Sequence, residues 1–268
     1  MTSKFDEAIH LTPDSDLSED TVTWTGFMTK DWSIGRVPNG GYTGALVLNA
    51  ALQHSGQAVA RSMTSHFYRP GVHGAPCTIT TEIRRRGRTM THADATLVQE
   101  GKVRLRAVGV FGDYPDDEVV NPTLPTKIPP PEECVLRDPA IQGHHMSLMD
   151  SLEIRIDPDI ESLVGDPHAE ARVEGWARFR DPRPNDALSL GLFADAFPPA
   201  VLIPRPDSGW VPTIELTSHI RARATSGWIR AQIRMESMRG GTMIENARLW
   251  DENNTLVAES RQLSMLLS

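Results

Sequence analysis

The sequence predicts an α+β protein made of two repeats, each an antiparallel sheet wrapped around one central helix. A proline-rich segment divides the 268 residues into two halves of domain size. Short motifs recur in both halves at nearly one offset. Each half also has an apolar helical segment followed by several strand-like segments, an order typical of α+β domains.

The proline-rich segment covers residues 115–139 and contains seven prolines. Proline has no backbone N–H group and a fixed φ angle, so this stretch cannot form a helix or a central strand. A stiff connector fits this composition. We therefore predict an N-terminal domain over residues 1–114, a linker over 115–139 and a C-terminal domain over 140–268.

Four short matches between the halves predict an internal duplication. The pairs are 64–67 (TSHF) with 217–220 (TSHI) at an offset of 153, 87–89 (GRT) with 240–242 (GGT) at 153, 95–97 (ATL) with 247–249 (ARL) at 152, and 45–48 (ALVL) with 199–202 (PAVL) at 154. A period near 150 is too long for a solenoid repeat. It indicates two copies of one small domain.

The predicted elements follow the same order in each half. In the first half, Asn39 is a plausible N-cap for a buried helix from Tyr42 to about His54. In the second half, the apolar run from Leu188 to about Phe197 predicts the matching helix. Alternating patterns predict strands at 78–84, 91–98 and 103–111, then near 212–222, 228–236, 243–250 and 255–265.

Charge and composition exclude several classes of protein. The chain has 27 basic and 35 acidic residues, a net charge of -8, which argues against a nucleic-acid partner. It has no apolar run long enough to cross a membrane, and its first residues lack the apolar core of a signal peptide. Two cysteines are too few for a disulfide framework. We expect a cytoplasmic protein with no membrane partner.

Familiar cofactor and metal motifs are absent from the sequence. It contains no GxGxxG, GxxxxGK[ST], HExxH or GxSxG pattern. His144 and His145 are adjacent, and adjacent strand residues point to opposite faces, so we do not expect them to bind a metal together. We predict no cofactor and no metal.

Three polar residues of the second half stand where the repeat offset places small residues in the first. Asp195 is the single carboxylate in the apolar run 190–197, and Thr213 and Gln262 lie on predicted strands. Their counterparts are Gly41, Ala60 and Gly109. A buried charge is costly without partners, so Asp195 is expected to be hydrogen-bonded or to serve chemistry. The alternative is that Asp195 caps a local turn and the other two are ordinary strand residues.

These residues also carry a resemblance to the acyl-CoA thioesterase II family, which has a double-hotdog fold. The sequence of residues 65–71, SHFYRPG, is similar to that family's Ser-Tyr-Phe-Leu-Arg-Pro-Gly strand. The segment Pro38–Tyr42 resembles the start of its first helix, and residues 213–215 resemble its Thr-Ile-Asp strand start. The resemblance extends from about Trp24 to Leu266.

The resemblance implies an acyl-CoA thioesterase in which water attacks the thioester directly. It implies that Asp195, Thr213 and Gln262 are catalytic and hold this water, with Thr217 as the rival to Thr213. We expect Gly40, Gly41 and His66 to contribute to substrate binding, although the family has Tyr at the position of His66. Sheet edges in this family commonly pair, so a homo-oligomer is expected.

Two other functions remain open at this stage. A hotdog enoyl-CoA hydratase would place an acid–base Asp–His pair at the start of the helix, where this chain has Asn39-Gly40-Gly41. A non-catalytic acyl-CoA or lipid-binding module would bind intact thioesters without turnover.

Overall fold

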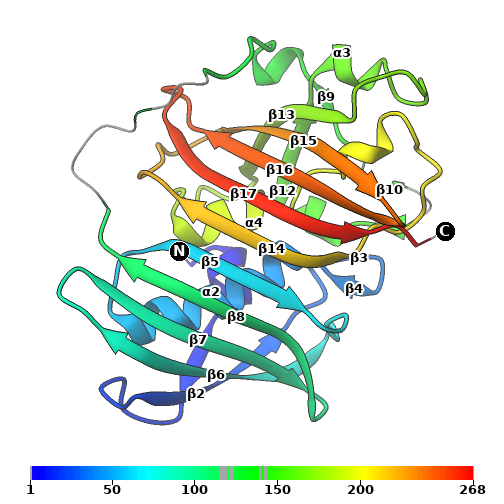
Figure 1. Cartoon of the computed structure of the whole chain (residues 1–268). Coiled ribbons are helices and arrows are strands. Elements are labelled where there is room, and N and C mark those ends of the chain that lie inside the picture. The colour runs from blue at the N-terminus through cyan, green and yellow to red at the C-terminus, as the bar shows by residue number, and fades with distance from the viewer. Residues whose placement is uncertain (1, 115–119, 121–123, 139, 142–143, 268) are drawn as a thin grey trace.

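Thirteen strands form one antiparallel sheet that curves around two helices (Figure 1). The computed structural model describes residues 2–114, 120, 124–138, 140–141 and 144–267. The helices are α1 (Lys4–Ala8), α2 (Gly40–Ser55), α3 (Pro158–Glu161) and α4 (Ala187–Phe193). The strands of the large sheet are β1 (Leu11–Pro13), β2 (Thr21–Met28), β5 (Val59–Phe67), β6 (Ala75–Arg86), β7 (Met90–Gln99), β8 (Lys102–Gly112), β9 (Val135–Leu136), β12 (Leu152–Ile156), β13 (Arg172–Phe179), β14 (Thr213–Ile220), β15 (Ile229–Arg239), β16 (Thr242–Trp250) and β17 (Leu256–Met265). Two small ribbons pair β3 (Ser33–Ile34) with β4 (Val37–Pro38) and β10 (Ala140–Ile141) with β11 (His144–His145).

The strand order confirms the predicted pair of repeats. It runs β1-β2-β6-β7-β8-β5 in the first half and β14-β17-β16-β15-β13-β12-β9 in the second. The strands β14, β15, β16 and β17 begin 154, 154, 152 and 154 residues after β5, β6, β7 and β8. The halves join where β5 pairs with β14, and there Thr64 lies opposite its repeat counterpart Thr217. The fold is the α+β double hotdog.

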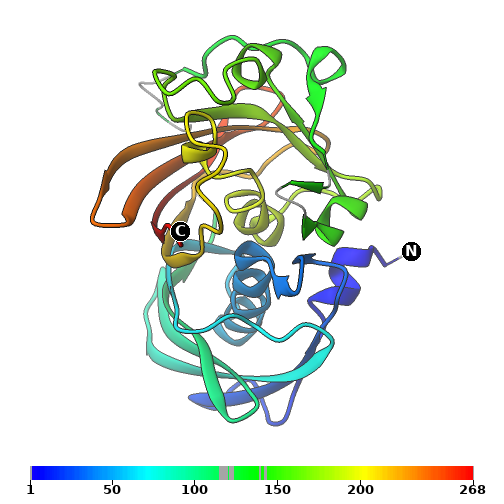
Figure 2. The same ribbon diagram turned by 90° about the vertical axis from the view of Figure 1, so that its right-hand side faces the viewer.

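Each half wraps its sheet around one helix, and the two helices pack against each other (Figure 2). Asn39 caps α2 as predicted, because its Oδ1 accepts a hydrogen bond of 3.0 Å from the N–H of Tyr42. Gly56 ends α2 in the left-handed conformation. Asp186 caps α4 through a reciprocal pair of hydrogen bonds with Ser189.

An aromatic cluster joins the two halves near the amino-terminal helix. Phe5 of α1 contacts Trp32 of the first half and Phe179 of the second, with ring centroids 5.1 and 5.2 Å apart. Tyr42 stacks on Trp32, and Phe179 packs against Phe193 of α4. All of these rings are buried. Aromatic burial on this scale stabilises both halves as one core.

The second central helix is shorter than the sequence predicted. It ends at Phe193, and Asp195 lies in the turn that follows. Pro198 and Pro199 come directly after this turn, and proline disfavours helix at the residue before it. Residues 199–202 contain a 3₁₀ turn, Ala200–Leu202, so their match with residues 45–48 of α2 is not a structural equivalence. Gly41 is likewise no structural counterpart of Asp195.

Several elements escaped the sequence patterns. The alternating patterns did not predict the strands β1, β2, β5, β12 and β13, although β2 alternates between buried and more exposed residues. The described part of the proline-rich segment holds a 3₁₀ turn, Pro131–Glu133, and the edge strand β9. Residues 115–119, 121–123 and 139 lie outside the described residues.

No helix of the described residues is long and apolar enough to cross a membrane.

A buried threonine ties the carboxyl end of α2 to the sheet. Thr81 Oγ1 accepts a hydrogen bond of 2.9 Å from Trp24 Nε1 and lies 2.7 Å from Nδ1 of His54. Nε2 of His54 donates to the carbonyl of Glu19, so in the neutral imidazole Nδ1 accepts the Thr81 hydroxyl proton. Because Thr81 and His54 are almost fully buried, no water can replace these bonds.

We expect Thr81→Val to lower the free energy of unfolding by about 1–3 kcal/mol, because it leaves buried donors and acceptors unpaired. Urea unfolding followed by tryptophan fluorescence measures this change. The neighbouring Thr80→Val on the other face of β6 is the control, with an expected effect within about 0.5 kcal/mol. Equal effects of the two variants would show that the hydrogen bonds of the Thr81 hydroxyl contribute nothing to the free energy of unfolding.

Candidate active site

A cavity of about 460 Å³ is lined by residues of both halves. Its exposed rim includes Tyr68, Arg69, Pro70, Met265 and Leu267. Much of its wall comes from residues 194–212, the chain that connects α4 to β14. The corresponding connection from α2 to β5 has only three residues, 56–58. The second repeat thus has a shorter helix, and the longer connection that follows it builds the cavity.

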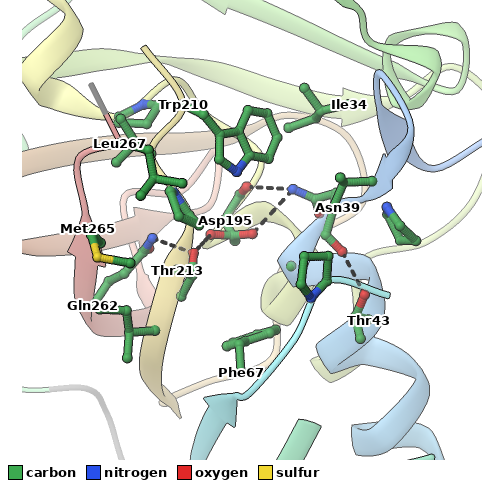
Figure 3. Close-up of a pocket in the computed structure, with 18 of the residues that line it drawn as sticks. Ile34, Asn39, Thr43, Phe67, Asp195, Trp210, Thr213, Gln262, Met265 and Leu267 are labelled. Carbon is green, nitrogen blue, oxygen red and sulfur yellow. Dashed lines mark hydrogen bonds between the residues drawn. The ribbon is translucent and has the colours of Figure 1, made fainter. Parts of the chain in front are cut away.

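Asp195 is the polar centre of this cavity (Figure 3). Its Oδ2 accepts hydrogen bonds from the backbone N–H of Gly41 at 2.7 Å and from Nδ2 of Asn39 at 3.2 Å. Its Oδ1 accepts a bond of 3.3 Å from the hydroxyl of Thr213. The carboxylate therefore faces the amino end of α2, where the helix dipole favours negative charge.

Asn39 serves two helices at once. Its Oδ1 caps the amino end of α2, and its Nδ2 also donates to the backbone carbonyl of Asp195 at 3.0 Å. That carbonyl follows the last turn of α4, where carbonyl groups have no partner within the helix. One amide side chain therefore fixes the distance between α2 and the Asp195 turn.

Burial raises the pKa of Asp195 to about 6, and the hydrogen bonds from Gly41, Thr213 and Asn39 oppose this shift. Desolvation penalises the ionised carboxylate, whereas donors stabilise it. At neutral pH the carboxylate is mostly ionised, and a carboxylate with a pKa near 6 is a stronger base than an ordinary aspartate.

Two glycines make the approach of α2 to Asp195 possible. A Cβ atom on Gly40 would lie 2.7 Å from Oδ2 of Asp195. A Cβ atom on Gly41 would lie 2.7 Å from the backbone carbonyl of Leu192 and 3.1 Å from Cβ of Asp195. Any larger residue at position 41 must move the backbone of α4, so the sequence Gly40-Gly41 is a packing requirement of this site.

A β-bulge turns Thr213 toward the cavity. In β14 the buried residues Leu216, Ser218 and Ile220 alternate with outward ones. The register shifts between Thr213 and Glu215, which changes the alternation by one residue. Thr213 therefore shares the inner face.

A chain of hydrogen bonds continues from Thr213 to the last strand. Gln262 Nε2 donates to Thr213 Oγ1 at 2.7 Å and to Ser264 Oγ at 2.8 Å. Both Gln262 and Ser264 lie on the buried face of β17, as the alternation predicted for Gln262. The amide protons of Gln262 are thus occupied by two hydroxyl groups, and its Oε1 accepts no hydrogen bond from the described residues.

The structure brings Asp195, Thr213 and Gln262 together, although Asp195 comes from a turn rather than the predicted helix. Gly40 lines the cavity, and Gly41 reaches it through its N–H group.

Two other candidates lie elsewhere. His66 is exposed on the outer face of β5, and its neighbour Phe67 lines the cavity instead, because strand side chains alternate. Thr217, the rival of Thr213, bonds to Thr64 and Glu215 outside the cavity.

Two buried charged residues outside the predicted site also line the cavity. Glu245 of β16 lies opposite Gln262. Burial raises the pKa of Glu245 to about 8; the N–H of Ala200 lowers this pKa, and the charge of Asp195 raises it further. It shares its strand face with Met243 and Ala247, an anomaly visible in the sequence. Arg137 comes from the proline-rich segment, where no periodicity could have indicated its place.

No group of three or more His, Cys, Asp or Glu side chains with the geometry of a metal site occurs in the part of the chain that the structure describes. The side chain of His144 lies outside the described residues, and His145 is 3.6 Å from Asp150.

Comparison with known families decides the relationship of this chain. Residues 28–112 match the family model described as the acyl-CoA thioesterase N-terminal domain, and residues 131–266 match the acyl-CoA thioesterase C-terminal domain. The chain belongs to the acyl-CoA thioesterase family. Both halves of the double hotdog are thus accounted for by one family, as the sequence resemblance implied.

Similar proteins cover nearly the whole chain. An uncharacterized protein of Mycobacterium tuberculosis is 28% identical, with 99% of each chain covered. A Thermobifida fusca protein provisionally assigned as a thioesterase II has 28% identity and a TM-score of 0.88, covering 100% of this chain and 98% of its own. A hot dog fold protein of unknown function from Alicyclobacillus acidocaldarius has 22% identity and a TM-score of 0.86, covering 100% and 99%. The last comparison supports the fold alone.

The geometry at the start of α2 predicts opposite effects for two glycine substitutions. We expect Gly41→Ala to lower the free energy of unfolding by about 1–3 kcal/mol, since its Cβ would overlap the Leu192 carbonyl. Gly44→Ala on the same helix meets no atom within 4 Å and should raise stability by about 0.5–1 kcal/mol. Thermal and urea unfolding measure both, and a neutral Gly41→Ala would contradict the described approach of α2 to α4.

Proposed function

We propose that this member of the acyl-CoA thioesterase family hydrolyses an acyl-CoA to the free acid and CoA by direct attack of water. The single observation that carries this proposal is the buried carboxylate of Asp195, held at the amino end of α2 within a cavity. Its hydrogen-bonded neighbours Thr213 and Gln262 support it. These are the residue types that the family resemblance implies for holding a water molecule.

In the proposed reaction Asp195 acts as general base. The attacking water gives one proton to the Asp195 carboxylate while its oxygen forms a bond to the thioester carbonyl carbon. The resulting tetrahedral intermediate collapses, the C–S bond breaks with its electron pair on sulfur, and the thiolate takes the proton back from Asp195. The products are a carboxylic acid and the thiol of CoA, so atoms and charges balance without a covalent enzyme intermediate.

Thr213 and Gln262 orient the base and the water. The Thr213 hydroxyl accepts a hydrogen bond from Gln262 and donates one to Asp195, so its proton points toward the carboxylate. The Oε1 of Gln262 then serves as the acceptor for the second proton of the water. Holding the water in this way removes much of the orientational entropy cost of the attack.

The amino end of α2 suits the developing oxyanion. The N–H of Gly41 donates to Asp195, whereas Gly40 lines the cavity beside it. We propose that the N–H of Gly40 and the positive end of the helix dipole stabilise the carbonyl oxygen as it becomes negative.

The two alternative functions have less support. A hotdog hydratase needs an acid–base histidine, and no histidine is among the described residues that line the cavity. In a binding module, a buried carboxylate whose pKa is raised to about 6 would lower the free energy of unfolding and would have no chemical task.

We expect Asp195→Asn to lower kcat/KM by more than about tenfold, a loss above roughly 1.4 kcal/mol in transition-state stabilisation. The asparagine Oδ1 can still accept from Gly41, so the fold should be retained. Thiol release from a panel of short, long, straight and aromatic acyl-CoAs measures activity. Asp207→Asn, an exposed position in the same connection, is the matched control. Retention of more than a tenth of the activity in Asp195→Asn would sink the assignment.

The raised pKa of Asp195 predicts a pH profile. Only the ionised carboxylate can accept a proton, so kcat/KM should fall as the pH drops through about 6 and should level off above it. Steady-state rates between pH 4.5 and 8 with a single acyl-CoA measure this limb, after checking that the protein stays folded at each pH. A profile that is flat from pH 5 to 8 would contradict Asp195 as the base.

A further inference from the structure

Arg137 is a buried cation in the wall of the cavity, and no carboxylate of the described residues forms an ion pair with it. Its side chain comes from the segment after β9, and the residue is 8% exposed. Its Nη1 donates to the carbonyl of Ala196 at 2.7 Å, and its Nη2 contacts Sδ of Met146 at 3.4 Å, a weak acceptor. Its Nε has no hydrogen-bond partner in the part of the chain that the structure describes. No carboxylate of the described residues lies within ion-pairing distance of it.

This arrangement destabilises the folded protein. A buried charge is ordinarily paired, because moving an unpaired charge out of water is strongly unfavourable. Burial lowers the pKa of Arg137 to about 10, which still leaves the guanidinium charged at neutral pH. The bond to Ala196 satisfies one carbonyl after α4, but a carbonyl does not neutralise the charge. Several donors of this planar, five-donor group therefore have no partner among the described residues.

The other charged residues of the cavity do not supply the missing anion. Asp195 is already held by Gly41, Asn39 and Thr213. Glu245 accepts from Ala200, and its pKa of about 8 leaves it mostly protonated at neutral pH. Neither carboxyl pairs with Arg137, and the protonated Glu245 does not repel an incoming anion.

We propose that Arg137 binds an anionic group carried by the acyl chain, so that the preferred substrates are CoA thioesters of dicarboxylic acids. This inference rests on the proposed thioester hydrolysis. A guanidinium offers a carboxylate paired donors in matching geometry. With the thioester at Asp195, the acyl chain lies in the same cavity, whose apolar lining includes Phe67, Phe197 and Leu202, and its terminal carboxylate binds Arg137.

The phosphates of CoA are the second source of such an anion. They carry several charges and remain hydrated, so they suit the exposed rim, where the guanidinium of Arg69 donates to the carbonyl of Val103. Arg137 is buried, whereas Arg69 is exposed. The two arginines therefore predict separate effects: Arg69 on the CoA moiety and Arg137 on the acyl group.

The test compares acyl-CoAs matched in length that end in a methyl group or a carboxylate: butyryl with succinyl, hexanoyl with adipoyl, and octanoyl with suberyl. We expect the wild type to favour the acid member of at least one pair by tenfold or more in kcat/KM. Arg137→Met should lower that member by roughly 30-fold or more, the loss typical of a buried charge pair, and change the methyl member by less than about threefold. Arg69→Met, the matched control, should leave the ratio unchanged.

The same acyl groups on N-acetylcysteamine separate the two sources of negative charge. This thiol has no phosphate, so a carboxylate preference that survives on it, and is lost in Arg137→Met, supports the proposal. An Arg137→Met effect that is equal for both members of a CoA pair and vanishes with N-acetylcysteamine overturns it in favour of phosphate binding.

The wild-type ratio alone tests the proposal even where Arg137→Met folds poorly, and preference for the methyl member in all three pairs refutes it. If the wild type hydrolyses none of the six thioesters, the proposed hydrolysis fails, and calorimetric binding of the intact pairs then tests Arg137 separately. Tighter binding of the acid members would support the role of Arg137, and equal or weaker binding would overturn it.

Discussion

The contact between the carboxylate of Asp195 and the amino end of α2 is the constraint on which the rest of the site depends. It draws together the start of the first repeat's helix and the end of the second repeat's helix, with Gly41 and Asn39 as donors. The approach requires the absence of side chains at positions 40 and 41. It also requires that the two repeats form one core, which the aromatic cluster around Trp32 and Phe179 provides. A single repeat contains only one side of this contact.

The asymmetry between the repeats explains how a duplicated fold builds this cavity. The strands of the two halves keep nearly the same spacing, but α2 has 16 residues and α4 has seven. The shorter helix α4 ends before Pro198, and residues 194–212 form the connection to β14. This connection carries Asp195 and much of the cavity wall. The first repeat contributes the helix start, the second contributes the carboxylate, and neither duplicates the contribution of the other.

The sequence predicted the features that follow from periodicity, and missed those that depend on distant contacts. Strand spacing and the N-cap at Asn39 could be predicted because they are local or repeated. Asp195 was identifiable because a carboxylate in an apolar run is costly. The second bond of Asn39, to the Asp195 turn, could not be predicted, because it links residues 156 positions apart. The bulge before Glu215 leaves no pattern in the sequence, so alternation alone would have misplaced Thr213. His66 shows the converse error, since a matching motif does not say which face of a strand a side chain occupies.

The buried acids of the cavity show what such a site costs the folded state. The pKa values of Asp195 and Glu245 are raised to about 6 and about 8 in the fold, above their values of about 4 in an unfolded chain. Both groups therefore bind protons more tightly in the folded state than in the unfolded state. Their contribution to the free energy of unfolding is fully present below about pH 4 and is lost as the pH rises through the folded pKa values. At neutral pH the ionised Asp195 therefore lowers the free energy of unfolding. Three donors around the carboxylate lower this cost, and the packing of the two halves into one core offsets the remainder. A carboxylate that destabilises its own fold, and is nevertheless held by donors from both repeats, is more readily explained by chemistry at that position than by packing.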